Sequence, residues 1–440
     1  MPNDANYNQI ILNPLRAWSL VSSSAFSSRR EFWILILIAL DMFFMIRGFA
    51  VSNLIEHIIL ILVISSSELR QRFLTVFKQH KFLIPLMLMW AWIAVSGLYS
   101  AASLLEIMDD IWSWRKILLI PLMIMLLTNS GRTHFFLSVF ATIGIGFLLL
   151  SISMDITDAR FTARSASNIL QNHSAQGVYF SLTGTLLALN VHREQDYHAK
   201  IILLILSAAF FYNTFAICDG RSGHTIGLIG FTVSVFAVLG LSRAERPKLK
   251  PKIIFSLFAV TMLVGVAVVF ELHLFTGLQK AFYNMSNAFT ADSKTSGGIR
   301  VVMWINTIEM IKDSFWLGTG AGGFEIGYSG VVENQNGWQA TITNNPHQQF
   351  LQIWAEYGIV AFGLFNAFLF GLAKHIIQLE KVPEKTILIF ILGSYLIMFM
   401  FNGAFTAPVE GRILMFILPI LLIHAQFVTK VDSPNQPEIN

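Results

Sequence analysis

The stretch NNPHQQFLQIWAEYG, residues 344–358, joins a polar segment of the chain to an apolar one that begins at Ile359. Asparagine caps exposed N–H groups and proline is tolerated at the first helical position, so we expect a helix to begin here with His347 in its first turn. The positive end of the helix dipole disfavours an imidazolium ion, which predicts a neutral ring that can accept a proton. His347 is therefore a candidate general base where a loop enters a hydrophobic segment.

The composition identifies that hydrophobic environment as a membrane. Of the 440 residues, 55% are hydrophobic and 13% are charged, which is too apolar for a soluble domain. A helix needs about 20 mainly apolar residues to cross a bilayer. Segments of this kind lie near residues 31–47, 49–65, 82–99, 112–128, 135–153, 174–191, 201–218, 223–241, 253–271, 348–372, 386–404 and 412–429. We therefore predict an all-α polytopic membrane protein with about twelve transmembrane helices.

These segments divide the chain into five parts. The expected parts are a cytoplasmic N-terminal segment (1–30), transmembrane helices one to nine (31–271), a large, mostly helical outer loop (272–346), transmembrane helices ten to twelve (347–429) and a cytoplasmic tail (430–440). Basic residues, most densely those of Ser242–Lys252, mark the cytoplasmic side. The net charge of +4 reports this orientation and does not indicate a nucleic-acid partner.

The outer loop contains a helical pattern followed by a glycine pattern. Apolar residues recur at helical spacing over residues 299–315, and Arg300 opens this helix. Gly318, Gly320 and Gly323 then match the spacing of a dinucleotide-binding loop, but no strand precedes them. We interpret them as a tight turn that lets the backbone approach a ligand or the bilayer closely.

Several arginines lie on the outer side, where the orientation of the chain does not require them. Arg221 lies in so short a turn that its guanidinium must lie at the membrane boundary or between helices, which costs about 2.5 to 3.5 kcal/mol on insertion scales. A salt bridge or snorkelling to lipid headgroups is the alternative explanation for each. Guanidinium groups bind phosphate oxygens in a bidentate manner. The candidate ligands of a lipid diphosphate are Arg160, Arg164, Arg221 and Arg300.

These residues suggest a transfer reaction from a lipid diphosphate. The arginines would stabilise the departing pyrophosphate while His347 takes the proton of an attacking hydroxyl. No D-x-D pair occurs that could hold a metal-bound nucleotide sugar, so we expect neither a metal nor another cofactor. By contrast, we expect Glu325, Glu333 and Glu356 to contribute only to loop solvation or helix polarity.

His347 is followed by Gln348, and Gly358 lies eleven residues after the histidine. In this motif, and in the succession of Arg300, Trp304 and the glycine turn, the chain resembles the O-antigen ligase and polymerase superfamily of bacterial inner membranes, most closely the O-antigen ligases. The resemblance covers about residues 298–363, with Gln348 and Gly358 as residues that support the motif. At Ala361 the chain departs from the Gly, Thr or Tyr of the ligase pattern.

The resemblance implies a GT-C-like glycosyltransferase whose active site faces the periplasm. Such ligases transfer polysaccharide from undecaprenyl pyrophosphate to a sugar hydroxyl of lipid A-core in lipopolysaccharide biosynthesis, with inversion and without a metal. It assigns catalysis to His347 and pyrophosphate binding to Arg300 and Arg221, while Arg160 and Arg164 rest on charge placement alone. The implied partners are the lipid-linked donor glycan, the lipid A-core acceptor and membrane lipids.

Three functions remain open at this point: the ligase, a sister enzyme of the same superfamily, and a transporter. An O-antigen polymerase or a protein O-oligosaccharyltransferase of the same superfamily would share the donor and the histidine helix, and no residue of the sequence names the acceptor. A transporter of lipid-linked sugars would also gather arginines, but it predicts inverted repeats and broken helices. No matching halves are recognisable in the sequence, so we rank the transporter last.

Overall fold

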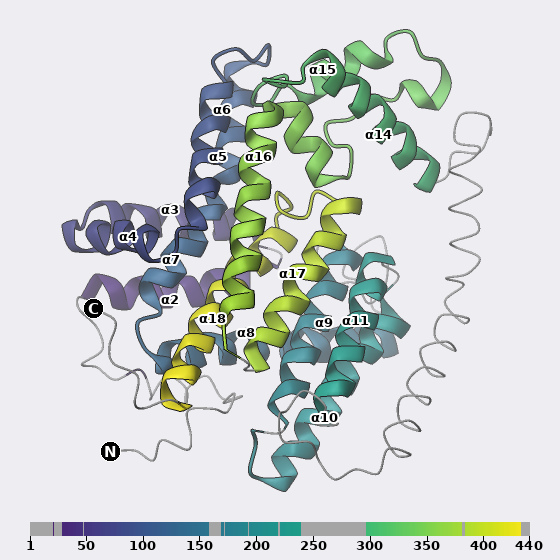
Figure 1. The fold of residues 1–440 in the computed structure, drawn as a ribbon. Coiled ribbons are helices and arrows are strands. Elements are labelled where there is room, and N and C mark those ends of the chain that lie inside the picture. Colours follow the sequence, from purple (N-terminus) through teal and green to yellow (C-terminus); the bar gives the residue numbers. More distant parts are fainter. Residues whose placement is uncertain are drawn as a thin grey trace.

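A computed structural model describes residues 21, 29–46, 48–157, 169–170, 172–191, 193–218, 221–238, 296–380 and 383–432. Within these ranges every regular element is a helix, as the sequence predicts (Figure 1). The elements of the first half are α2 (Arg29–Phe44), α3 (Phe49–Ile64), α4 (Ser67–Gln79), α5 (Leu83–Ser96), α6 (Leu104–Ser113), η3 (Trp114–Leu118), α7 (Leu119–Leu126), α8 (Ser130–Thr157), α9 (His173–Asn190), α10 (Tyr197–Tyr212), η4 (Asn213–Ile217) and α11 (Arg221–Val238). Those of the second half are α14 (Ser296–Asp313), α15 (Phe324–Val332), η5 (Gly337–Ala340), α16 (Gln349–Gln378), α17 (Pro383–Phe401) and α18 (Glu410–Asp432).

The predicted apolar segments fall on these helices, except the one at 253–271, which lies outside the described residues. By length and composition, five of the described helices can cross a membrane, namely α8, α10 with η4, α16, α17 and α18. The pair α3 and α4 passes the same test jointly but is bent by 100° between the two helices. The multi-pass character therefore agrees with the prediction, and the count of twelve helices stays a prediction.

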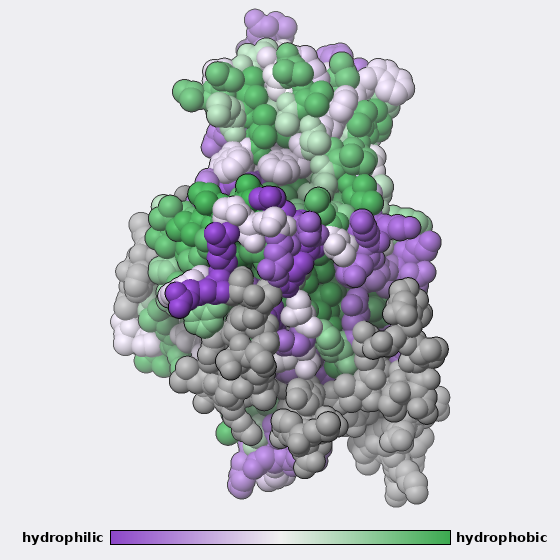
Figure 2. Space-filling view, turned by 90° about the vertical axis from the view of Figure 1, so that its left-hand side faces the viewer, coloured by the Kyte–Doolittle hydropathy of each residue, from purple (hydrophilic) through white to green (hydrophobic). Residues whose placement is uncertain are grey.

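The bend between α3 and α4 has a local cause. Ser66 begins α4 as its N-cap and accepts the Leu69 N–H at 3.4 Å. The sequence of α4, SELRQRFLTVFKQ, is charged and amphipathic, so it does not continue the apolar helix before it. In Figure 1, α2, α3 and α4 run across the direction of α5 and α16. Figure 2 views the molecule from this side, with hydrophilic residues across the middle and hydrophobic residues exposed above them.

The core lies around α7, α9 and α18. Every residue of α7 is buried. In α18, 89% of the apolar stretch of 18 residues that could cross a membrane is buried inside the protein. Helices α9 and α11 approach one another backbone to backbone, since a Cβ added to Gly177 would lie 2.4 Å from the Gly223 Cα. This contact fixes the first turn of α11, in which Arg221 is the first residue.

A smaller helical unit lies beyond one end of α16 and α17, at the top of Figure 1. It consists of α14, α15 and η5, so the described part of the predicted outer loop, residues 296–346, is largely helical. The unit has its own hydrophobic cluster, in which Met310, Phe324 and Tyr328 are buried against Ala355 of α16. The first part of the predicted loop, residues 272–295, lies outside the described residues.

Candidate active site

His347 lies just before α16 and not in its first turn, so this prediction was wrong. Its backbone is left-handed, with φ of 54°. The Asn345 side chain accepts the His347 N–H at 2.7 Å, while the Gln348 side chain caps the helix by accepting the Leu351 N–H. Asn345 therefore forms a local turn at the histidine, and the helix begins at Gln349 rather than at Pro346.

The His347 ring is half-buried beside a cation. Burial lowers the pKa of His347 below its usual value of 6.5, and the nearby Arg300 guanidinium lowers it further. A hydrogen bond with the side chain of Asn402, which follows α17, acts in the opposite direction. The ring is therefore neutral near pH 7, as predicted, and both burial and the Arg300 charge favour this state.

Helix α14 holds Arg300 next to the histidine loop. The indole Nε1–H of Trp304 donates to the Pro346 carbonyl at 3.0 Å, and its ring centroid lies 6.1 Å from that of Phe401. Arg300 lies four residues before Trp304 on the same helix, so both side chains point to the same face. The structure thus brings Arg300 and His347 together and uses Trp304 as the link between α14 and the loop.

The structure does not describe the side chains of the other three predicted arginines. Arg221 is the first residue of α11, and only its backbone is described. Arg160 and Arg164 lie outside the described residues. Their roles toward a pyrophosphate, like that of Arg300, stay predictions.

Gly358 interrupts α16 with a backbone that suits only glycine. Its φ of 73° and ψ of −176° turn the chain out of the helix at this point. A Cβ at this position would lie 2.2 Å from the Trp316 carbonyl oxygen. The motif residue that the sequence singled out therefore serves a close backbone contact.

The glycine turn satisfies the backbone groups that this kink releases. The N–H groups of Thr319 and Gly320 donate to the carbonyls of Ala355 and Glu356 at 3.0 and 2.7 Å. The Ile359 N–H donates to the Phe315 carbonyl at 3.1 Å. The turn thus allows a close backbone approach, as predicted, and the segment that it approaches is α16. The turn and the kink fix α14, and so Arg300, relative to the start of α16.

A pair of carboxyl groups that the sequence reasoning missed lies under the turn. Glu356, expected to be a mere polar residue of the helix, is 4% exposed. The Gly322 N–H donates to Asp110 Oδ2 at 2.9 Å and to Glu356 Oε1 at 3.2 Å, and the Tyr357 hydroxyl donates to Asp110 at 2.9 Å. Burial raises the pKa of Asp110 to about 6. The outer Asp109-Asp110 pair was visible in the sequence, but nothing in it relates α6 to α16.

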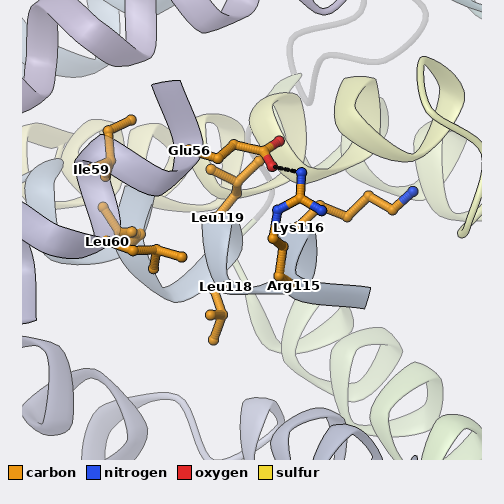
Figure 3. Close-up of a pocket in the computed structure, with 8 residues that line it drawn as sticks. Glu56, Ile59, Leu60, Arg115, Lys116, Leu118 and Leu119 are labelled. Atoms are coloured by element: carbon orange, nitrogen blue, oxygen red, sulfur yellow. Dashed lines mark ion pairs between the residues drawn. The ribbon is translucent and has the colours of Figure 1, made fainter. Parts of the chain in front are cut away.

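A second buried charge cluster holds the loop that carries Asn402. Glu56 of α3 pairs with Arg115 at 2.9 Å and with Arg412 at 2.6 Å, and Figure 3 shows the first two side chains directed at one another. Lys116 points away from them and donates to the carbonyls of Thr406 and Ala407. The space beside the pair is about 10 Å³, which is room for one water at most. We therefore assign this cluster to structure rather than to ligand binding.

In the described part of the chain, no three His, Cys, Asp or Glu side chains are grouped as metal ligands would be. A reaction without a metal stays a prediction.

The apolar helices that can cross a membrane are those of a multi-pass membrane protein, and His347 lies at the end that carries the helical unit. The family model described as O-antigen ligase matches residues 199–366, a range that includes Arg221, Arg300, His347 and Gly358. This match confirms the predicted resemblance to the O-antigen ligase and polymerase superfamily, whose members are membrane glycosyltransferase-like enzymes. A search of curated proteins finds no match to the chain.

Proposed function

We propose that the protein is an O-antigen ligase of the bacterial inner membrane. It would transfer a polysaccharide from undecaprenyl pyrophosphate to a sugar hydroxyl of lipid A-core at the periplasmic face. One observation carries the proposal: a neutral histidine and an arginine lie together at one end of the apolar helices, within the residues that match the family.

The proposed reaction assigns a separate role to each group. His347 takes the proton from the acceptor hydroxyl, whose oxygen attacks the anomeric carbon of the donor sugar. The bond from that carbon to the pyrophosphate oxygen breaks on the opposite face, which inverts the configuration. Arg300, together with the predicted Arg221, Arg160 and Arg164, stabilises the charge of the leaving undecaprenyl pyrophosphate.

The geometry assigns further residues to positioning. Asn345 and Asn402 orient the histidine through its backbone and its ring, respectively. Gln348 and Gly358 form the start and the kink of α16, so neither needs to touch a substrate. Of the motif residues, His347 is therefore the catalytic one, and Gln348 and Gly358 shape the backbone that holds it.

The test is complementation of a strain that lacks its own copy of the gene with His347→Ala. We expect loss of long-chain lipopolysaccharide while full-length polymer accumulates on undecaprenyl pyrophosphate. His198→Ala, in an exposed residue of α10, is the matched control and should restore the ladder. Accumulation of single repeat units would identify a polymerase. Normal amounts of both long-chain lipopolysaccharide and lipid-linked polymer would show that His347 is not catalytic, and would favour protein glycosylation or transport.

A further inference from the structure

A cavity of about 480 Å³ lies between α6, α15 and the first turns of α16. This volume is in the range of sites that bind small ligands. Its walls come from three helices that are separate in the chain. Gly322 of the glycine turn also lines it, so the turn lies where these helices meet. No step of the proposed reaction has yet used this space.

The charge of the cavity has one sign. Its lining includes the carboxyl groups of Glu106, Asp109, Asp110, Glu325 and Glu356, and none of the described residues that line it is a lysine or arginine. Such walls repel a phosphate and accept hydrogen bonds from hydroxyl or ammonium groups. The diphosphate donor is therefore excluded from this cavity, and sugars without phosphate fit its chemistry.

The cavity is lined in part by the chain segments on either side of His347. Asn344 and Gln352 line it, and they flank the histidine on either side in the sequence. The Gln352 Oε1 also lies 3.2 Å from the position of a Cβ built on Gly403, the residue after Asn402. A glycan in the cavity would thus lie beside the turn that presents the histidine.

We propose that this acidic cavity binds the acceptor glycan through sugars that carry hydroxyl or amino groups and no phosphate. The inference rests on the proposed function, which requires an acceptor hydroxyl next to His347. Arg300 and the acidic cavity then divide the site by charge: the diphosphate lies on the arginine side and the acceptor on the carboxylate side.

Two exposed carboxylates allow a test that leaves the protein's internal contacts intact. Asp109 and Glu325 line the cavity and form no ion pair within the described residues. By contrast, Asp110 and Glu356 bind Gly322, and Glu106 caps α6 through Ser103. Glu325→Lys and Asp109→Lys therefore each replace one negative charge of the cavity wall by a positive one, without removing a structural hydrogen bond. Glu333→Lys is the matched control, because Glu333 is also exposed, at the end of α15, but does not line the cavity.

The first measurement is binding of core oligosaccharide, released from the host lipopolysaccharide, to the full-length protein in nanodiscs by saturation-transfer NMR. We expect binding to weaken about tenfold in Glu325→Lys and in Asp109→Lys, as for the loss of a charge-assisted hydrogen bond, and to stay unchanged in Glu333→Lys. Removal of phosphate from the oligosaccharide should leave its binding intact. Unchanged binding in both cavity variants, or binding that requires the phosphate groups, would overturn the proposal.

The second measurement separates this inference from the ligase reaction itself. With a lipid-linked donor, the cavity variants should raise the KM for lipid A-core about tenfold and leave the KM for the donor unchanged. Normal transfer with an unchanged acceptor KM would disprove the acceptor site and leave the ligase proposal standing. Charge-sensitive glycan binding without any transfer by the wild-type protein would support a glycan site and contradict the ligase.

Discussion

The N–H of Gly320 donates to the carbonyl of Glu356 at 2.7 Å, which joins the glycine turn to α16 backbone to backbone. The contact exists because α16 breaks at Gly358 two residues later and leaves that carbonyl without its helical donor. The Gly320 N–H takes the place of the missing helical donor. The same hydrogen bond fixes the position of the glycine turn. Since α14 leads directly into this turn, the distance between Arg300 and His347 depends on the same contact.

Gly358→Ala should therefore damage the site from a distance. An alanine cannot adopt this backbone without a cost of about 1–3 kcal/mol, and its Cβ would lie 2.2 Å from the Trp316 carbonyl oxygen. We expect a lower unfolding temperature in detergent and loss of long-chain lipopolysaccharide in complementation. Gly363→Ala, on the same helix with open space around its Cβ, should match the wild type in both assays. Equal behaviour of the two variants would contradict the role of the kink.

Glu56→Ala should be among the most destabilising substitutions of the described core. It would leave Arg115 and Arg412 buried without their carboxylate partner, for which the usual cost is about 3–5 kcal/mol. The exposed pair of Lys312 and Glu309 provides the control, since Glu309→Ala should change stability by at most about 1 kcal/mol. Thermal unfolding of the purified protein measures both, and a small effect at Glu56 would show that the cluster is hydrated.

Much of the fold follows from the sequence because apolar length and helix formation are local properties. The predicted segments coincide with helices from α2 to α18 wherever the chain is described. The bend between α3 and α4 was not predicted, although the charged α4 sequence could have signalled it. A change from apolar to amphipathic pattern within a few residues marks such a bend.

The site was predictable only where a motif or a charge stood out. His347, Arg300 and Gly358 were singled out from the sequence, and the structure places them on one connected frame. Asp110 and Glu356 were missed because their proximity depends on a kink and a turn that join residues 246 positions apart, the difference between 356 and 110. The actual start of α16 was missed because asparagine favours both helix caps and local turns.

Trp304→Phe should separate the anchoring of the histidine loop from the packing of α14. Phenylalanine keeps an aromatic ring against Phe401 but cannot donate to the Pro346 carbonyl, a hydrogen bond of about 1 kcal/mol. We expect a transfer rate reduced by about fivefold, as for that loss of energy, with little change in the unfolding temperature. Trp316→Phe, in a residue that is 72% exposed, is the control and should leave the rate unchanged. If the free energy of unfolding fell by as much as the activation free energy of transfer rose, Trp304 would serve folding alone.

The pH dependence of transfer tests how the His347 environment sets its charge. A general base works in its neutral form, so the rate should fall as the pH decreases through the pKa of His347, which burial and Arg300 place below 6.5. Arg300→Gln removes a positive charge that disfavours the imidazolium ion, which raises that pKa and moves the loss of activity to higher pH. Asn402→Ala removes a hydrogen bond that favours the charged form, so its acidic limb should move to lower pH. The readout is the midpoint of the acidic limb in the purified protein, because both variants also lower the maximal rate. Midpoints that coincide with the wild type in both variants would mean that a group other than His347 controls the limb.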